Sequence, residues 1–359
     1  MEQHLWGIPN MDVYLVMGIL IFFIVLEVIG GYWVKTNRGT GDWIQEFGAF
    51  LILSLLIKPG IVLLAIYLGG QLFPGAQYML AAWPFVGTLL LYLFVDDFLQ
   101  HWYHRAAHEF PFLWKLHRPH HQAEEMGFFV SYRNAALYYL LMPNIWWIGI
   151  MTFLGGGLAV ALGLVLKQLI IISSHSTMVY DKYLYAHSWL RPVATVWERI
   201  FITPAFHHAH HGKTQLDGIS EPNGNFGNMF SIWDQLFGTA HYTRQFPETY
   251  GLPNDSKDHW TAAYLYPIVK SDIATSEISK GFTKRDQRQN EPLMVQLEQG
   301  QFYLFCQCGF SKKQPFCDGS HHGTAFRPLR FQARKSGPAR LCACKRTQAG
   351  PFCDDSHLQ

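Results

Sequence analysis

The sequence has few charged residues and no cysteine in its first 305 positions. Asp, Glu, Lys and Arg make up 15% of the 359 residues, against roughly 25% in an average soluble protein. The net charge is only +2, and no basic cluster of the kind that binds nucleic acid occurs. With 49% hydrophobic residues, the chain is neither disordered nor collagen-like. We therefore expect a folded protein with no nucleic-acid partner.

The scarcity of charge is confined to one part of the chain. Residues 1–270 hold 15 basic and 18 acidic residues, whereas residues 271–359 hold 13 and 8 in a third of that length. Apolar runs long enough to cross a bilayer, which takes about 20 helical residues, occur only in the first part. They cover residues 11–34, 47–73, 78–99 and 135–154, and a shorter run covers 158–173. The pattern predicts five membrane crossings.

Basic residues predict the orientation of these crossings, because positively charged loops stay on the cytoplasmic side. They follow the first and third runs, and Arg38, Arg105 and Arg133 are among them. This places the N-terminus outside and everything after the fifth run in the cytoplasm. Lys58 and Lys167 fall inside apolar runs, where a charge is costly. We expect interior pairing of these lysines, or a break in the helix at Lys58-Pro59-Gly60.

A polar, unperiodic stretch separates the membrane part from a small C-terminal part. Residues 271–290 contain few large apolar side chains, as is typical of a linker. The sequence therefore predicts a membrane domain at 1–270, with its motifs at 97–239, a linker at 271–290 and a C-terminal domain at 291–359.

Histidine is abundant, and most of it is clustered. Twelve of the 18 histidines lie between His101 and His211. Helix positions i, i+3 and i+4 share a face, so a cluster with this spacing can aim two or three imidazoles at one point. Three clusters have it: His104 and His108; His117, His120 and His121; His207, His210 and His211.

Eight imidazoles exceed what one metal ion can coordinate, so the clusters imply two ions. Imidazole suits iron, zinc, copper and nickel. Two iron ions with open positions can bind and reduce O2, whereas two zinc ions favour hydrolysis. Spacing alone leaves both open.

The segments around the clusters resemble a known family. DDFLQHWYHRAAH, LWKLHRPHH, TPAFHHAHH and NFGNMFSIWDQLFGT are similar, in this order, to the signatures of the fatty acid hydroxylase/sterol desaturase superfamily of membrane di-iron oxygenases. The similarity covers about Asp97 to Thr239. It implies that the eight clustered histidines bind two non-haem iron ions.

Two further ligands are expected from this resemblance and from the sequence around them. His175 stands where the family usually has another histidine, although Thr177 replaces the asparagine that usually follows. His187 is a second candidate, because it belongs to a similar His-Ser pair twelve residues later.

Other polar residues are expected to support the ligands without binding metal. Asp97 lies two helical turns before His104 and could orient a ligand imidazole through its second nitrogen. His101 is expected beside the ligands or at the surface, as is His208. Asn225, Trp233 and Asp234 match the family pattern and are expected to support the site.

All six cysteines lie in the last 54 residues, in two copies of the pattern C-x-C-x8-C-x3-H offset by 36 positions. A cytoplasmic location and the repeated histidine favour metal binding over disulfides. Three thiolates and one imidazole suit either zinc or an iron-sulfur cluster.

The segments around these cysteines, CQCGFSKKQPFCDGSH and CACKRTQAGPFCDDSH, resemble tandem copies of the CDGSH iron-sulfur family. The resemblance implies a 2Fe-2S cluster in each copy. The ligands would be Cys306, Cys308, Cys317 and His321, and then Cys342, Cys344, Cys353 and His357. Asp355 stands where the first copy has Gly319. His322 does not fit the spacing and is expected to be exposed.

Together these patterns predict a mainly α fold. It is a polytopic membrane helical bundle with a cytoplasmic histidine-rich cap, plus a small β-rich C-terminal iron-sulfur domain. The resemblances imply an O2-dependent oxidoreductase that hydroxylates or desaturates a lipid such as a sterol or fatty acyl chain. A cytoplasmic reductase would supply electrons through the C-terminal domain.

Two other functions fit the same residues. One is a zinc-dependent membrane hydrolase whose cysteine domain is regulatory. The other is a membrane-anchored iron-sulfur sensor or cluster-transfer protein.

Overall fold

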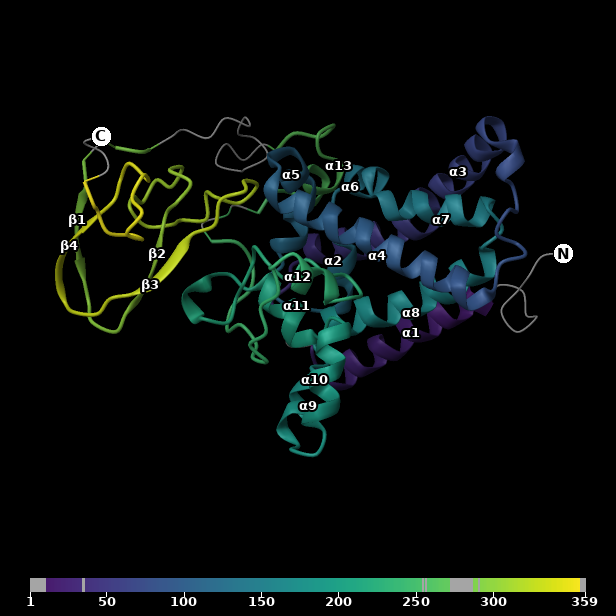
Figure 1. Cartoon of the computed structure of the whole chain (residues 1–359). Helices are drawn as coiled ribbons and strands as arrows, with labels where there is room; N and C mark the ends of the chain where they lie inside the picture. Colours follow the sequence, from purple (N-terminus) through teal and green to yellow (C-terminus); the bar gives the residue numbers. More distant parts are fainter. Residues whose placement is uncertain are drawn as a thin grey trace.

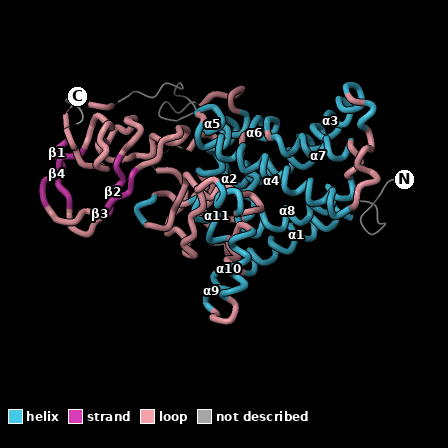
Figure 2. Tube along the Cα trace, viewed as in Figure 1, coloured by secondary structure: helices cyan, strands magenta, loops and turns pink. Residues whose placement is uncertain are grey.

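The computed structural model describes residues 11–33, 36–253, 255, 257–271, 287–289 and 291–355. It consists of a helical part and a smaller C-terminal part that contains the strands (Figures 1 and 2). The C-terminal part lies at one end of the helical part, near α5 (Pro111–His121) and α11 (Pro204–His211). The predicted class, a mainly helical membrane region with a small β-containing domain, is confirmed.

In the described part of the chain, three helices are long and apolar enough to cross a membrane. They are α1 (Met11–Ile29), α8 (Gly157–His175) and a continuous helix over residues 40–72. The last comprises α2 (Thr40–Ile52), a π-helical turn (Leu53–Ile57) and α3 (Lys58–Leu72). The helix therefore continues through the predicted break at Lys58-Pro59-Gly60. The π-helical turn ends two residues before Pro59, which lacks the backbone N–H that a regular helix requires.

The other two predicted crossings are not continuous apolar helices. α4 (Phe85–Glu109) begins after Pro84 and carries Asp96 and Asp97 in its middle. The run at 135–154 divides into α6 (Ala136–Leu141) and α7 (Pro143–Phe153), because proline disfavours helical conformation in the residue before it. Within the described residues only three candidate spans are found, so the expectation of five crossings is not confirmed.

α4 lies at the centre of the helical part, where it packs against α5, α7 and α8. A buried ion pair joins Lys167 of α8 to Asp96 of α4. Interior pairing of this lysine is therefore confirmed.

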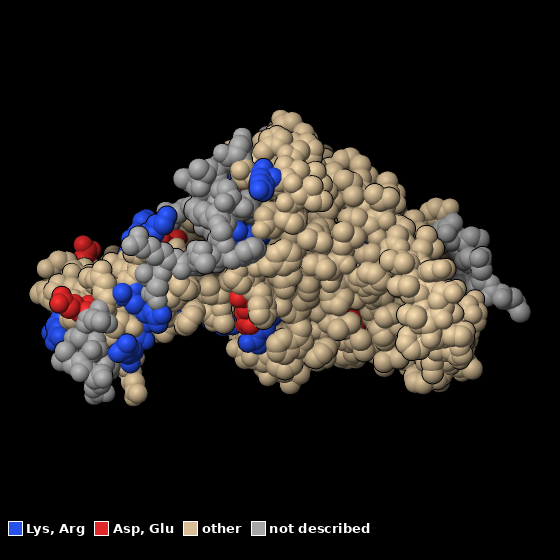
Figure 3. All heavy atoms as spheres, turned by 90° about the horizontal axis from the view of Figure 1, so that it is seen from above, with Lys and Arg blue, Asp and Glu red and all other residues tan. Residues whose placement is uncertain are grey.

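Exposed apolar side chains support the membrane location of this part. Phe22 on α1, and Leu63 and Tyr67 on α3, are more than half exposed, and lipid would cover such surfaces. On the face shown in Figure 3, charged residues gather on the C-terminal part and at its junction with the helices. Uncharged side chains cover most of the helical part on the same face.

The cap is built from the remaining helices and the loops between them. These are α5, α9 (Tyr180–Ala186), α10 (Arg191–Ile200), α11, α12 (Ile232–Leu236) and α13 (Trp260–Leu265).

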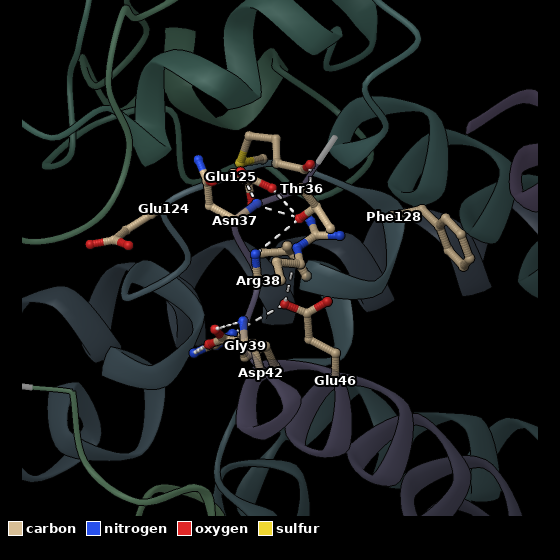
Figure 4. A network of polar contacts seen from close by, with 12 residues as sticks. Thr36, Asn37, Arg38, Gly39, Asp42, Glu46, Glu124, Glu125 and Phe128 are labelled. Atoms are coloured by element: carbon tan, nitrogen blue, oxygen red, sulfur yellow. Dashed lines mark hydrogen bonds and ion pairs between the residues drawn. The ribbon is translucent and has the colours of Figure 1, made fainter. Parts of the chain in front are cut away.

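Figure 4 shows how the connection between α1 and α2 holds one of these loops. The Asn37 N–H donates to Glu125 Oε1 (2.8 Å), and Arg38 Nη2 donates to the Met126 carbonyl (3.0 Å). Arg38 also lies 3.8 Å from Glu46. These contacts fix the segment that leads into the 3-10 turn Phe128–Tyr132, which packs against α5 and α8.

The C-terminal part contains two antiparallel strand pairs. β1 (Leu293–Leu297) pairs with β4 (Gly337–Leu341), and β2 (Phe302–Phe305) pairs with β3 (Leu329–Gln332). β1 and β2 precede the first cysteine copy, and β3 and β4 lie between the two copies. Each pair therefore joins a strand before the first copy to a strand before the second.

Hydrogen bonds within the two copies recur at the same offset of 36. The Cys306 N–H donates to Pro315 O, and the Cys342 N–H to Pro351 O, both at 2.8 Å. Likewise Lys312 N donates to Asp318, and Gln348 N to Asp354, both at 2.9 Å. The sequence repeat is thus matched by a repeated backbone conformation.

Candidate metal centres

Two groups of buried histidines lie side by side in the cap. In each group one nitrogen from every residue lies within 4.8 Å of the others. The first histidine group contains His104, His108, His117, His121 and His210; the second histidine group contains His120, His175, His207 and His211.

Helix periodicity explains the membership of each group. His104 and His108 lie one turn apart on α4, and His117 and His121 lie one turn apart on α5. His120, a neighbour in sequence, points about 100° away from His121 and joins the second group. α11 repeats the arrangement, with His210 in the first group and His207 and His211 in the second.

Because α5 and α11 each serve both groups, the groups are adjacent. The rings of His121 and His211, one from each group, stack with centroids 4.7 Å apart and planes at 18°. Two ions held by these groups would therefore be neighbours.

Backbone carbonyls orient four of the imidazoles. In each case the ring donates from Nδ1 to a carbonyl oxygen. His104 donates to Phe226 (2.9 Å), His120 to Val130 (2.8 Å), His175 to Ile171 (2.8 Å) and His210 to Gly224 (2.7 Å). A carbonyl only accepts, so Nδ1 carries the proton in each ring and Nε2 presents a lone pair to its group.

The charge state of the rings also suits metal binding. Burial holds the pKa of His117, His121 and His211 well below the ordinary value, so each ring is neutral at physiological pH. A neutral imidazole is the form that binds metal. The donor set therefore fits two metal ions.

Asp97 supports the site through a loop rather than through a ligand. Its carboxylate accepts hydrogen bonds from Met229 N (2.8 Å), Phe230 N (2.9 Å) and Trp233 Nε1 (3.1 Å). Among the described residues it bonds to no histidine, contrary to the expectation that it orients an imidazole. Its role is to tie α4 to the loop before α12.

Asp234 and Asn225 shape the same loop, as expected for supporting residues. Asp234 accepts from Phe226 N (2.8 Å) and Gly227 N (2.7 Å), and burial raises its pKa to about 6. Asn225 Nδ2 donates to Phe206 O (2.8 Å). Together they position the carbonyls that hold His104 and His210.

Three other predicted histidines lie outside both groups. His101 is buried with its Nδ1 3.9 Å from Asp234 Oδ2. His208 is buried and hydrogen-bonded to the Tyr250 hydroxyl (3.0 Å). His187 follows α9, on the helical pair that projects from the cap (Figure 1), and its Nδ1 donates to Tyr183 O (2.9 Å). We therefore leave His187 out of the proposed ligand set.

A cavity leads from the histidine groups into the membrane helices. Its apolar wall includes Met142, Ile145, Ile148, Leu164 and Ile171. Its polar wall includes Lys58, Asp96, Asn144 and Lys167. Asp96 lies eight residues before His104 on α4, and Lys167 eight before His175 on α8. The polar wall is therefore about 12 Å from His104 and His175 along these helices.

The donors of the first cysteine copy form two pairs. The Cys306 and Cys308 sulfurs are 3.6 Å apart, and Cys317 Sγ is 3.1 Å from His321 Nδ1. The hydrogen bond from the Cys308 thiol lowers the pKa of Cys306 and so favours its thiolate. A 2Fe-2S cluster takes two protein donors on each iron, as in the mixed cysteine and histidine ligation of Rieske centres. The pairs fit such a cluster.

The second cysteine copy has the same left-handed turn as the first, although Asp355 replaces the glycine found there. The Cys342 and Cys344 sulfurs are 3.4 Å apart, whereas His357 lies outside the described residues. Asp355 adopts a left-handed φ of 63°, in the same region as the 89° of Gly319. The substitution therefore preserves the local backbone.

The first copy faces the cap. His321 Nε2 is hydrogen-bonded to the Asn223 amide (3.0 Å). The His322 ring stacks on Trp114 of α5, with centroids 5.0 Å apart and planes at 13°. The expectation that His322 is exposed is wrong, since only 8% of its surface is accessible. Sequence reasoning missed Asn223 and Trp114, because no local pattern signals a contact between residues so distant in the chain.

Comparison with known proteins agrees with this architecture. Residues 89–239 match the fatty acid hydroxylase family, and residues 274–322 match the iron-binding CDGSH-type zinc finger family. The second match covers the first cysteine copy and not the second.

Three relatives illustrate these matches. Alkylglycerol monooxygenase of Caenorhabditis elegans is 27% identical over 65% of this chain and 42% of its own length. The ornithine lipid hydroxylase OlsE of Rhizobium tropici is 27% identical over 44% of this chain and 43% of its own. The human mitochondrial CDGSH iron-sulfur domain-containing protein 3 is 51% identical over 12% of this chain and 37% of its own. The chain thus spans less than half the length of each. It contains a fatty acid hydroxylase domain followed by a CDGSH iron-sulfur domain.

Proposed function

We propose that the chain is a membrane-bound oxidoreductase that uses O2 and two histidine-bound iron ions to hydroxylate or desaturate a lipid. One observation carries the proposal: nine buried histidines lie at the end of a cavity that runs between membrane helices. The relatives named for alkylglycerol and ornithine lipid support a lipid substrate.

The cavity wall would bring a substrate carbon to the metal ligands. Iron in the two groups would bind and reduce O2 and so provide an oxidant for an unactivated C–H bond. His104, His120 and His175 reach the cavity wall, so a carbon held there lies beside both groups. The apolar side chains around it exclude water from the reacting position.

The polar wall would orient the other end of the lipid. Lys58, Asp96 and Lys167 place two amines and one carboxyl group within the membrane helices. Such groups are costly in a bilayer unless they are paired, and they commonly mark functional sites. We therefore expect a substrate with an alkyl chain and a polar group that contacts Lys58.

The C-terminal domain would supply electrons. We propose a 2Fe-2S cluster in each cysteine copy, with His357 as the fourth ligand of the second, and a cytoplasmic reductase as the electron source. The proposed boundaries are 1–270, 271–290 and 291–359. Tethering keeps the donor at a high effective concentration. We infer from the basic loops that both metal-binding parts face the cytoplasm, which protease access to a C-terminal tag in oriented vesicles tests.

Metal analysis tests the proposal most directly. Protein purified without air should contain about six iron atoms per chain, two in the histidine groups and two in each cluster. Two zinc ions without histidine-bound iron would overturn the oxygenase and favour a hydrolase. Clusters with no metal in the histidine groups would favour the sensor or cluster-transfer function.

Lipid profiling tests activity and substrate together. Cells that express the chain should accumulate a hydroxylated or desaturated lipid, and His211→Ala should abolish it. His187→Ala, outside both groups, is the matched control. Identical lipids with and without the wild-type chain would contradict the proposal.

The electron supply needs a separate test. Cys317→Ser combined with Cys353→Ser should abolish reductase-supported turnover and retain turnover driven by hydrogen peroxide. Unchanged reductase-supported turnover would show that the C-terminal domain is not the donor.

A further inference from the structure

Trp114 lies between the C-terminal domain and the first histidine group. One face of its indole stacks on His322 at 5.0 Å. Its ring centroid is also 5.2 Å from that of His108 and 5.6 Å from that of His121, both members of the first histidine group. Trp114 is 4% exposed, so no solvent layer separates these rings.

The other end of this contact reaches the cysteine donors. The rings of His322 and His321 have centroids 4.3 Å apart, and His321 Nδ1 is 3.1 Å from Cys317 Sγ. Aromatic rings with neighbouring centroids 4.3–5.6 Å apart therefore run from the donor pair of the first copy to the first histidine group. No other pair of metal-binding positions in the two domains is joined in this way among the described contacts.

The backbone at the junction is shaped for close approach. Gly323 has a φ of 70°, and a Cβ added to it would lie 2.9 Å from Trp114 Cβ. Gly319 has a φ of 89°, and its added Cβ would lie 2.9 Å from Pro253. A side chain at either position would both strain the left-handed backbone and come too close to the neighbouring atoms. The hydrogen bond from the Asn223 amide to His321 fixes the same surface.

We propose that Trp114 and His322 form the contact through which electrons pass from the first cluster to the first histidine group. Both are positioning residues: they hold the two metal sites at close range and are neither oxidised nor reduced. The inference rests on the proposed function and adds a route to it. It also assigns the transfer to the first copy, which leaves the second copy to receive electrons from the reductase.

The electron balance is simple. Each passage oxidises a reduced 2Fe-2S cluster by one electron and reduces one ferric ion to ferrous. Two passages, one O2 and two protons convert R–H to R–OH and release one water. A reduced flavoprotein is the class of donor that refills the clusters.

Flash reduction without O2 or substrate tests the route separately from turnover. A photoreduced flavin injects one electron into a cluster of the oxidised full-length protein. Recovery of the cluster's visible absorbance then reports electron departure to the ferric histidine centre. We expect Trp114→Leu to lose the fast recovery phase and Trp114→Phe to retain most of it. Trp189→Leu, at a tryptophan that is 72% exposed, should recover like the wild type.

Iron content and cluster potential are measured on every variant. A Trp114→Leu protein with full iron content and an unchanged potential that still recovers at the wild-type rate would overturn the route. If instead Trp114→Leu loses iron, the Gly323→Ala variant tests the route. Its added methyl group would push the C-terminal domain away from Trp114 without changing a residue of the cap. Its control is Gly300→Ala, at a φ of 85° with no atom within 4 Å of the added Cβ. Equal recovery in these two glycine variants would overturn the route.

The same measurement distinguishes failure of the route from failure of the proposed electron supply. If the injected electron never leaves the clusters of the wild-type protein, internal supply itself is wrong. If it leaves equally fast with Trp114 replaced, internal supply stands and only the route through Trp114 is wrong.

Discussion

His104 and His210 direct their Nε2 atoms at each other across 3.0 Å, although both rings donate from Nδ1 to backbone carbonyls. Neither Nε2 then carries a proton, and two lone pairs at this distance repel. A cation near both atoms turns the repulsion into coordination. The loop that carries Gly224 and Phe226 thus prepares the first histidine group for metal before any metal binds.

The two groups should differ in their tolerance of ligand loss. The second has four histidines and the first has five, so His211→Ala leaves three ligands, whereas His121→Ala leaves four. We expect His211→Ala to release its iron to a chelator and His121→Ala to retain more. The rings of these residues stack on each other, which makes the variants a matched pair. Equal or greater iron loss from His121→Ala would contradict the assignment.

Metal affinity should depend little on pH between 7.5 and 6. Burial holds the pKa of His117, His121 and His207 well below 6.5. A proton competes with metal only as the pH falls through the pKa of the folded, metal-free protein. Exposed histidines with an ordinary pKa of about 6.5 would already lose affinity in this range. Cobalt titration of the metal-free protein at both pH values measures the effect, and a steep fall toward pH 6 would contradict it.

The helical spacing of the histidines predicts that they form a site, but it does not predict how they divide into two groups. The i, i+4 pairs His104–His108 and His117–His121 each share one group, as their periodicity indicates. The division of neighbours such as His120 and His121 depends on how α5 is rotated against α11. That rotation is set by packing across the cap, which spacing within one helix does not encode.

Contacts between distant segments account for the other differences. The exposure of His322 could not be judged without Trp114, which lies far away in the sequence. The crossings predicted from apolar run length likewise took no account of Pro143, which divides one expected crossing into two helices. They also took no account of the charged residues in the middle of α4. The pairing of Lys167 was predictable because a buried cation needs a partner, but its partner Asp96 was not identified.

Removing one member of the Lys167–Asp96 pair should be worse than removing both. Both side chains are almost fully buried. Lys167→Met alone therefore leaves the Asp96 side chain without its ion-pair partner in the membrane helices, and Asp96→Asn alone leaves Lys167 without its partner. Breaking a buried pair typically costs about 3–5 kcal/mol, whereas replacing both members is often nearly neutral. We expect the double variant to unfold at a higher temperature in detergent than Lys167→Met. An additive loss in the double variant would mean that the residues act independently.

Replacing Asp97 should destabilise the cap without changing the metal ligands. Asp97→Ala leaves three buried donors, Met229 N, Phe230 N and Trp233 Nε1, without their acceptor. Each unsatisfied group costs about 1–3 kcal/mol, so the thermal midpoint should fall clearly. Asp97→Asn retains an acceptor oxygen, so its thermal midpoint should fall less. Because Asp97 bonds to the loop and, in the described part of the chain, to no imidazole, the absorption spectrum of cobalt bound to the histidine groups should be the same in both folded variants. A changed cobalt spectrum with an unchanged thermal midpoint would mean that Asp97 acts on a ligand rather than on the loop.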